Sequence, residues 1–253
     1  MLVVNDRIYE MFAFVAGSPY DGSPEATVDG GRVLGRFHRN LSGYESDWQP
    51  SQRGYHDAHT VRDHLNRLPG SIGKDDSVAG RESELLSTIS VVYDCYDTAS
   101  ERVSEAGFAD WPAQVVHADW HPGNMLFAGG IVEAVIDYDS LRLLPAVTDL
   151  ANGVLQFSIK GGPIEPANWP AQLDEDRFRR FLIGYDQEFA LPPAQVQVLP
   201  WLMIEALIGE AVMPIAATGS FGRTEGFRFL QMITRKVRWL EQNGERLMTV
   251  LSA

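Results

Sequence analysis

Most of the chain shows the hydrophobic spacing that is typical of helices. Apolar residues recur about every three to four positions, so that they share one face of a helix, and polar residues fill the remaining positions. Pro69 and Gly70 are helix breakers, and we expect them to end one of these segments at Leu68. The spacing predicts helices over residues 24–41, 56–68, 78–108, 148–159, 175–190, 194–216 and 223–251.

The pattern changes period in two parts of the chain. The stretch "RIYEMFAFVAG" (Arg7 to Gly17) carries aromatic and branched residues and predicts a strand that leads into a loop. Residues 114–117 predict a short strand, and "MLFAGGIVEAVIDY" (Met125 to Tyr138) predicts two strands joined at Ala128-Gly129-Gly130. The sequence therefore predicts an α+β protein, mostly α, in which a helical body carries one small sheet.

Polar residues gather where this small sheet turns, in "VVHADWHPGNMLF" and at the end of the hairpin. Asp119 and Asn124 lie in the first stretch, and Asp137 ends the second strand of the hairpin. Because a hairpin folds back on itself, we expect Asp137 to return to the vicinity of Asn124. Carboxylate and amide oxygens suit Mg²⁺ as ligands, and Asp119, one loop away, can accept a hydroxyl proton.

The order of these residues resembles the catalytic loop of kinase-like enzymes. Protein kinases have H-R-D-x-x-x-x-N followed by D-F-G, whereas this chain has "HADWHPGN" followed by "IDYD". The sequence is similar to the aminoglycoside phosphotransferase family, which includes choline kinase and the type II homoserine kinases. That family has a loop of the form H-G-D-x-H-x-x-N, then a hairpin, I-D-x-[DE] and D-L-A. The stretches "YEMFAFVAGSP" and "LGRFHRNL" resemble its hinge strand and its L-x-x-L-H helix, so the resemblance extends from Tyr9 to about Asn152.

The resemblance implies a role for each polar residue of the loop and hairpin. Asp119 would be the catalytic base that accepts the proton of the substrate hydroxyl. Asn124 and Asp137 would hold Mg²⁺ against the phosphates of ATP or GTP. His117 and His121 would brace the loop through hydrogen bonds, because an imidazole can bond on both sides of its ring.

Two further assignments follow from the same resemblance. Asp149, in "DLA", would anchor the loop region and cap the helix that follows. The backbone of Phe12, Ala13 and Phe14, in the hinge-like strand, would face the adenine.

The overall charge limits the classes of substrate. The net charge is −13 and the sequence pI is about 4.8, which argues against a nucleic-acid partner and weakly favours a cationic or neutral substrate. We therefore expect the acceptor to be a small molecule with a hydroxyl group, such as an amino alcohol or an aminoglycoside. Asp139, Glu205 and Glu210 are candidate contacts for it, although the two glutamates can equally mark the wet edge of an apolar helix.

Two observations suggest the compartment. The single Cys95 cannot form an internal disulfide, which favours a reducing environment. No apolar run reaches the roughly 18 residues of a membrane-spanning helix, and the first residues do not resemble a signal peptide. We expect a cytoplasmic protein without a membrane partner.

The resemblance also suggests how the chain divides. In kinase-like enzymes a smaller lobe supplies a Gly-rich loop and a lysine that contact the nucleotide phosphates. This chain has no G-x-G-x-x-G, and its first lysine is Lys74. We therefore expect residues 1–16 to be a remnant of that lobe with its hinge strand. Residues 17–253 would form the C-terminal lobe of a protein-kinase-like fold, with the catalytic loop at 117–124 and the metal-binding hairpin at 125–139.

Such a remnant strand would expose an unpaired edge. We therefore expect either a homodimer or a separate chain that supplies the smaller lobe, joined through residues 1–17. Two alternatives to a phosphotransferase remain open. One is a non-catalytic lobe remnant that binds a nucleotide, a metabolite or a partner. The other is a metal-dependent hydrolase with Zn²⁺ or Mn²⁺ ligated by His117, Asp119, His121 and Asp137.

Overall fold

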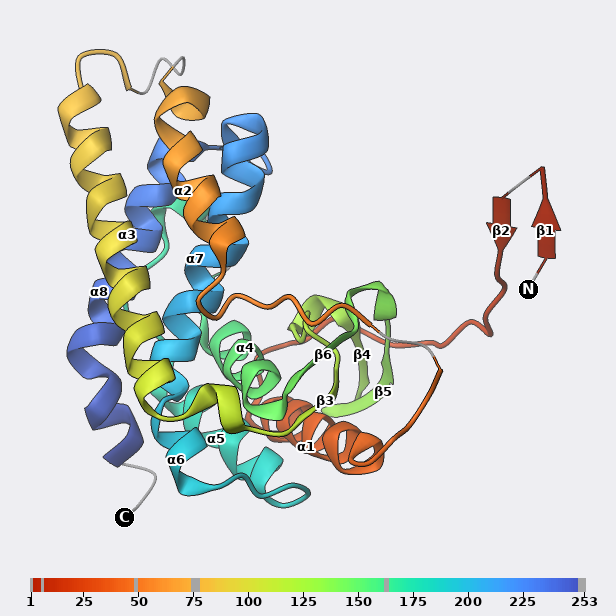
Figure 1. The fold of residues 1–253 in the computed structure, drawn as a ribbon. Helices are drawn as coiled ribbons and strands as arrows, with labels where there is room; N and C mark the ends of the chain where they lie inside the picture. The colour runs from red at the N-terminus through yellow and green to blue at the C-terminus, as the bar shows by residue number, and fades with distance from the viewer. Residues whose placement is uncertain (1, 6, 48–49, 74–77, 162–163, 250–253) are drawn as a thin grey trace.

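The computed structural model describes residues 2–5, 7–47, 50–73, 78–161 and 164–249. These residues form a bundle of long helices, a smaller region that combines helices with two small sheets, and an N-terminal arm that extends away from both (Figure 1). The expectation of a mostly helical α+β protein is confirmed.

The bundle is built around α7 (Leu199–Thr218), which packs against α2 (His59–Ile72), α3 (Glu82–Glu105) and α8 (Gly226–Thr249). Most residues of α7 are buried, because apolar side chains occur all around the helix. Within the described residues, α7 is also the one helix whose length and composition would allow it to span a membrane. Since 72% of its apolar window is buried inside the protein, it has the character of a core helix.

The second region brings together helices that are far apart in the sequence. α1 and α5 pack closely, because each presents glycine to the other. A side-chain carbon at Gly31 or Gly184 would collide with a backbone carbonyl of the opposite helix. The remaining helices have these bounds: α1 Pro24–Leu41, α4 Ala146–Ser158, α5 Glu175–Asp186 and α6 Pro193–Gln197.

Two small antiparallel sheets lie beside α1 and α4 (Figure 1). The predicted hairpin is confirmed: β4 (Met125–Ala128) pairs with β5 (Ile131–Val135). The predicted strand near residue 114 is β3 (Ala113–Val116), and its partner is β6 (Arg142–Pro145), which the periodicity did not predict. A third pair, β7 (Ser220–Phe221) and β8 (Thr224–Glu225), precedes α8.

Several predicted boundaries are wrong. α2 continues through Pro69 to Ile72, because Leu68 and Ile72 belong to its buried face. The single helix predicted over 194–216 is divided between α6 and α7, where Pro200 occupies the first turn of α7. α3 is shorter at both ends than predicted, and glycines with positive φ, Gly80 and Gly107, flank it. The last two residues of the helix predicted over 223–251 lie outside the described residues.

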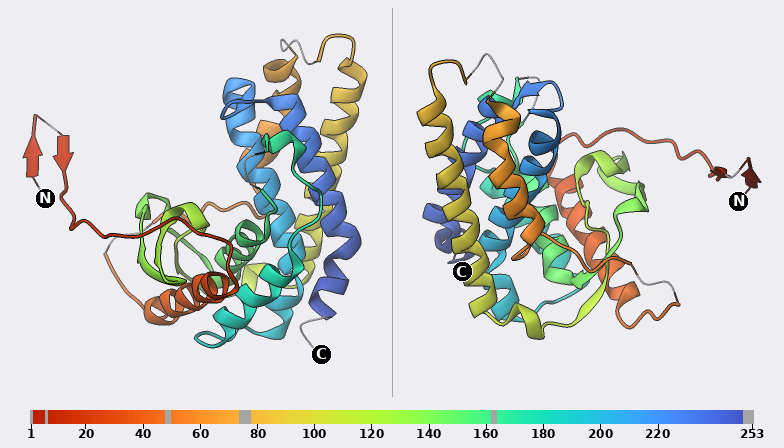
Figure 2. Two further views of the ribbon diagram at one scale, coloured as in Figure 1. Left: turned by 180° about the vertical axis from the view of Figure 1, so that it is seen from behind. Right: turned by 45° about the horizontal axis from the view of Figure 1, so that its top comes forward.

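The N-terminal arm differs from the expected strand. Only β1 (Leu2–Val4) and β2 (Arg7–Tyr9) pair, and the arm then runs without regular structure to Ser18, which bonds to Phe127 of β4. Both orientations in Figure 2 show β1 and β2 well apart from the rest of the protein. The arm therefore contacts the described body only at its inner end.

Candidate active site

The hairpin places Asn124 beside Asp137. Met125 pairs with Val135 in the β4–β5 ladder, and the amide of Ile136 donates to the carbonyl oxygen of Asn124 at 2.9 Å. Asp137 follows directly, so the residues at the two ends of the hairpin meet at one edge of the sheet. The structure thus brings together the amide and the carboxylate that were predicted to hold Mg²⁺.

The side chains at this edge suit a hard cation. Asn124 donates through Nδ2 to the backbone oxygen and to Oδ2 of Asp119, both at 3.0 Å, which leaves Oδ1 available as a ligand. Asp137 makes no hydrogen bond or ion pair within the described residues, and it has a positive φ of 65°. A non-glycine residue in this left-handed region is strained, and such strain occurs at functional sites. One amide oxygen and one free carboxylate, with room for water and phosphate, fit Mg²⁺.

A buried carboxylate fixes the loop that carries Asp119. Asp149 of α4 accepts hydrogen bonds from the amides of His117 and Ala118 at 2.8 Å and 2.9 Å. It also bonds to Nε2 of the buried His38 on α1 at 3.1 Å. The expectation that Asp149 caps its own helix is wrong: Pro145 occupies the N-cap position of α4, and the carboxylate points to the preceding loop instead.

The two loop histidines contact the loop in different ways. His117 is fully buried, and its Nε2 lies 3.3 Å from the carbonyl oxygen of Ile136, which ties the loop to the end of the hairpin. His121 accepts a hydrogen bond through Nδ1 from the amide of Gly123 at 2.9 Å. Its Nε2 lies 3.6 Å from Oδ2 of Asp119. Both histidines are therefore placed to hold the shape of the loop.

The contact between His121 and Asp119 shifts the pKa of both side chains. The neighbouring His121 imidazole lowers the pKa of Asp119, and burial opposes this shift. In return, Asp119 raises the pKa of His121, against the effect of burial. Asp119 is consequently ionised at neutral pH and able to accept a proton.

Ala118 occupies a strained position between these groups. Its φ is 61°, in the left-handed region that favours glycine. The family that the sequence resembles has glycine at this position of its H-G-D loop. The positive φ gives a physical reason for that family's preference for glycine. The chain keeps the loop conformation with alanine because Asp149 binds the amide of Ala118 and the amide of the preceding His117.

A cavity of about 570 Å³ opens on one side of Asp119. Neither Asn124 nor Asp137 lines it. Asp119 thus stands between the predicted metal ligands and the cavity, where an acceptor hydroxyl would have to lie. The cavity is lined by Ser51, Arg53, Gly54, Tyr55, His56, Ala118, Asp119, Ser140, Arg142, Leu144, Thr148, Asp149, Asn152, Leu202, Glu205, Ala206 and Met213.

The weaker candidates fall in three different environments. Glu205 lines the cavity but is engaged by His56 at 3.0 Å and by Ser100 at 2.6 Å. Glu210 accepts from Asn152 and Gln156, and burial, assisted by the charge of Asp119, raises its pKa to about 7. Asp139 is exposed in the 3₁₀ turn that follows Asp137.

The predicted adenine segment does not reach this site. Phe12 and Phe14 are 81% and 93% exposed and lie with Ala13 in the N-terminal arm.

Most polar residues of the cavity were missed from the sequence, among them Tyr55, Arg142 and Asn152. The signal for two of them was their position, since Arg142 follows "IDYDSL" and Asn152 lies one turn after Asp149. Tyr55 lies in an irregular segment and carried no signal.

The sequence model of the phosphotransferase enzyme family matches residues 4–195. The chain belongs to this family. No curated protein matches the chain.

Several solved structures resemble this chain in fold. An amicoumacin kinase in complex with AMP-PNP and Ca²⁺ is 18% identical, with a TM-score of 0.60 over 91% of this chain and 63% of its own. A microcompartment-associated aminopropanol kinase is 13% identical, with a TM-score of 0.62 over 89% of this chain and 64% of its own. An aminoglycoside phosphotransferase from Alicyclobacillus acidocaldarius is 15% identical, with a TM-score of 0.62 over 92% of this chain and 70% of its own. The chain thus spans less than two thirds of the length of the first two of these kinases. At sequence identities this low, the likeness establishes the fold alone.

Within the described residues, no group of three or more His, Cys, Asp or Glu side chains is arranged to hold a metal ion. His117 and His121 bond to the backbone of the loop and hairpin instead, so the structure offers no Zn²⁺ cluster in support of the hydrolase alternative.

Proposed function

We propose that the protein is a small-molecule O-phosphotransferase that transfers the γ-phosphate of ATP or GTP to an acceptor hydroxyl. One observation carries the proposal. Asp119 accepts a hydrogen bond from Asn124 and lines an open cavity, and the hairpin brings the free carboxylate of Asp137 next to Asn124. A proton acceptor placed between two potential metal ligands and a cavity is the arrangement that phosphoryl transfer requires.

The transfer step follows from this arrangement. The oxygen of the acceptor hydroxyl forms a bond to the γ-phosphorus, and the bond from that phosphorus to the β,γ-bridging oxygen breaks. The bridging oxygen keeps the electron pair and leaves as part of the nucleoside diphosphate. Asp119 takes the hydroxyl proton, and the loop contacts of Asp149 hold this carboxylate in place.

Asn124 Oδ1 and the carboxylate of Asp137 would hold Mg²⁺, which neutralises charge on the transferred phosphate. The segment from Phe12 to Phe14 would lie against the nucleotide base once a partner chain covers the N-terminal arm. Met11, Phe12 and Phe14 are 96%, 81% and 93% exposed, and apolar side chains in this number favour a partner surface. The partner would be a second copy of the chain or a separate smaller lobe, and a monodisperse monomer in solution scattering would contradict this part of the proposal.

The base assignment can be tested by γ-phosphate transfer from MgATP to a panel of hydroxylated small molecules and to water. We expect Asp119→Asn to lower the transfer rate by about 10²–10⁴-fold, the usual contribution of general base catalysis. Asp110→Asn, an exposed carboxylate outside the site, is the matched control and should transfer at the rate of the original chain. Activity that survives Asp119→Asn would show that another group accepts the proton.

The metal assignment has an independent test in nucleotide binding. We expect Mg²⁺ to tighten the binding of ADP to the original chain but not to Asp137→Asn, because the substitution removes the charged ligand. Binding of MgATP without any transfer would instead identify the non-catalytic alternative.

A further inference from the structure

The cavity beside Asp119 is lined by two arginines, Arg53 and Arg142, that form no ion pair within the described residues. Its acidic lining residues, apart from Asp119, already have partners. Asp149 binds the loop amides and His38, and Glu205 binds His56 and Ser100. These two carboxylates are therefore not available to a ligand.

The two arginines of the cavity lack acidic partners. The guanidinium of Arg142 is positioned by the carbonyl oxygens of Ser140 and Leu141, each at 2.9 Å, and it forms no ion pair within the described residues. Arg53 is exposed and its side chain likewise makes no ion pair among these residues. Within a chain whose net charge is −13, two unpaired guanidinium groups on one cavity form a local site for an anion.

One uncharged side chain in the same cavity has an atom without a partner within the described residues. Asn152 is 4% exposed, and its Oδ1 accepts no hydrogen bond within the described residues. Its Nδ2 donates to Glu210 at 2.8 Å, which fixes the orientation of the amide. A buried acceptor without a donor costs free energy, so it favours a ligand that donates to it.

Tyr55 contributes a hydroxyl to the same space. Burial raises the pKa of the Tyr55 hydroxyl, and the charges of Glu210 and Asp119 raise it further. Gly209 of α7 makes room for the ring, because a side-chain carbon there would collide with it.

We propose that the phosphoryl acceptor carries an anionic group, a carboxylate or a phosphate ester, that binds Arg142 and Arg53. A second hydroxyl or amino group of the acceptor donates to Oδ1 of Asn152, and the reacting hydroxyl faces Asp119. This inference rests on the proposed function, since it takes the cavity as the acceptor site. It replaces the amine expected from net charge, because the charges that line the cavity act at shorter range than the surface charge.

Binding without nucleotide tests the proposal through a set of probes that share a three-carbon skeleton. Glycerate and glycerol 3-phosphate carry an anion, glycerol is neutral, and 3-amino-1,2-propanediol is a cation. We expect the original chain to bind one or both anionic probes about tenfold or more tightly than the neutral and cationic ones, because charge-assisted hydrogen bonds to a guanidinium are the strong ones. The preferred probe distinguishes a carboxylate from a phosphate ester. Tighter binding of the amine would overturn the proposal.

The contribution of the guanidinium groups can be separated from folding. Arg142→Gln should weaken the preferred anionic probe by about tenfold and leave glycerol unchanged. Arg53→Gln should weaken binding of the same probe by a smaller factor, because the guanidinium group of Arg53 is exposed and solvent ions screen its charge. Arg67→Gln on α2, an exposed arginine outside the cavity, is the control with the same charge change. Equal affinity of the original chain, Arg142→Gln and Arg53→Gln would overturn the proposal.

Steady-state kinetics distinguish the acceptor from the nucleotide. We expect Arg142→Gln to raise the KM of the acceptor and to leave the KM of MgATP unchanged. The opposite result would show that Arg142 serves the nucleotide phosphates and would overturn the assignment. Anionic probes that bind through Arg142 but receive no phosphate would instead contradict the proposed function, while the anion site would stand.

Discussion

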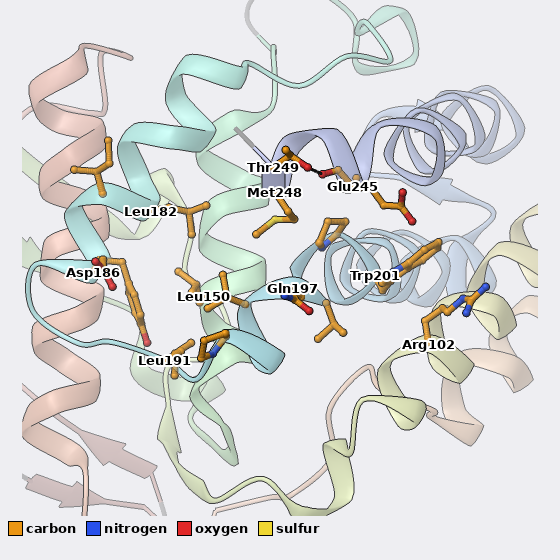
Figure 3. Close-up of a pocket in the computed structure, with 17 residues that line it drawn as sticks. Arg102, Leu150, Leu182, Asp186, Leu191, Gln197, Trp201, Glu245, Met248 and Thr249 are labelled. Atoms are coloured by element: carbon orange, nitrogen blue, oxygen red, sulfur yellow. Dashed lines mark hydrogen bonds between the residues drawn. The ribbon is translucent and has the colours of Figure 1, made fainter. Parts of the chain in front are cut away.

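Two cavities of the described residues differ in what lines them. The larger, about 800 Å³, lies among α4, α5, α6, α7 and α8 and includes Trp201, Leu182 and Met248 (Figure 3). Its charged lining residues include Asp186 and Glu245 near its edge (Figure 3). The smaller, about 570 Å³, contains Asp119 and the unpaired oxygen of Asn152.

The two cavities differ in their unsatisfied polar groups as well as in their volume. None of the buried side-chain atoms that lack a partner lines the larger cavity. Ligand sites combine an apolar surface with a few polar groups, and one such unsatisfied atom, Oδ1 of Asn152, belongs to a residue of the smaller cavity. Substitutions in each cavity test whether phosphoryl transfer depends on the smaller cavity alone.

The largest effect is expected from the same substitution placed in each cavity. Asp149→Asn removes an acceptor from the amides of His117 and Ala118, and we expect it to lower the free energy of unfolding by about 2–4 kcal/mol. Transfer activity should fall at least tenfold as Asp119 loses its position. Asp186→Asn, at an exposed residue of the larger cavity, should change neither. Urea unfolding and transfer assays measure both, and equal effects of the two variants would contradict the comparison.

A substitution in the wall of the larger cavity should separate stability from activity. Trp201 packs against the hydrophobic core, so Trp201→Ala should lower the free energy of unfolding by about 2–3 kcal/mol. We expect the KM of the acceptor to remain unchanged, because the indole does not line the cavity at Asp119. A rise in this KM without a loss of stability would show that the larger cavity takes part in binding.

Glu210 predicts a dependence of stability on pH. Burial raises its pKa from 4.5 to about 7, so between these values the folded protein holds a proton that the unfolded chain has released. The contribution of this group to stability is therefore complete below about pH 4.5 and is lost as the pH rises to about 7. The glutamine of Glu210→Gln stays neutral at every pH. This variant should therefore lack the fall in the free energy of unfolding, on the order of 2 kcal/mol, that the original chain shows between acidic and neutral pH. Parallel urea titrations at pH 5 and pH 8 measure it, and an unchanged difference between the two pH values would show that Glu210 is not the group responsible.

The smallest effect concerns the strained peptide of the catalytic loop. Ala118→Gly relieves the cost of a positive φ but increases the freedom of the unfolded chain, so we expect a net gain of about 1 kcal/mol or less. Gly54→Ala in the same cavity is a contrasting change, because Gly54 has no positive φ and the added carbon would contact Leu144. Thermal unfolding compares the two, and a loss of stability in Ala118→Gly would show that the alanine side chain contributes contacts that outweigh the strain.

Local pattern in the sequence was sufficient for much of the fold. The periodicity predicted α1 with both ends correct, and the change of period predicted the β4–β5 hairpin. A hairpin also relates its two ends, so the meeting of Asn124 and Asp137 followed from the sequence. The boundaries at Pro69 and near Pro200 were wrong, because the burial of a helix face decides whether a helix continues through a proline.

Tertiary structure decided the remainder of the site. β6 was missed because its pairing with β3 joins segments separated by the whole hairpin. The partner of Asp149, His38, lies 111 residues away, and the partner of Glu205, His56, lies 149 residues away. Whether a polar side chain is satisfied within the protein or left free for a ligand depends on such distant contacts. The sequence by itself therefore determined the elements and the loop chemistry, because these depend on neighbouring residues. Only packing decided that Glu205 is engaged, whereas Arg142 forms no ion pair and Oδ1 of Asn152 accepts no hydrogen bond within the described residues, because contacts between remote parts of the chain settle which polar groups find partners.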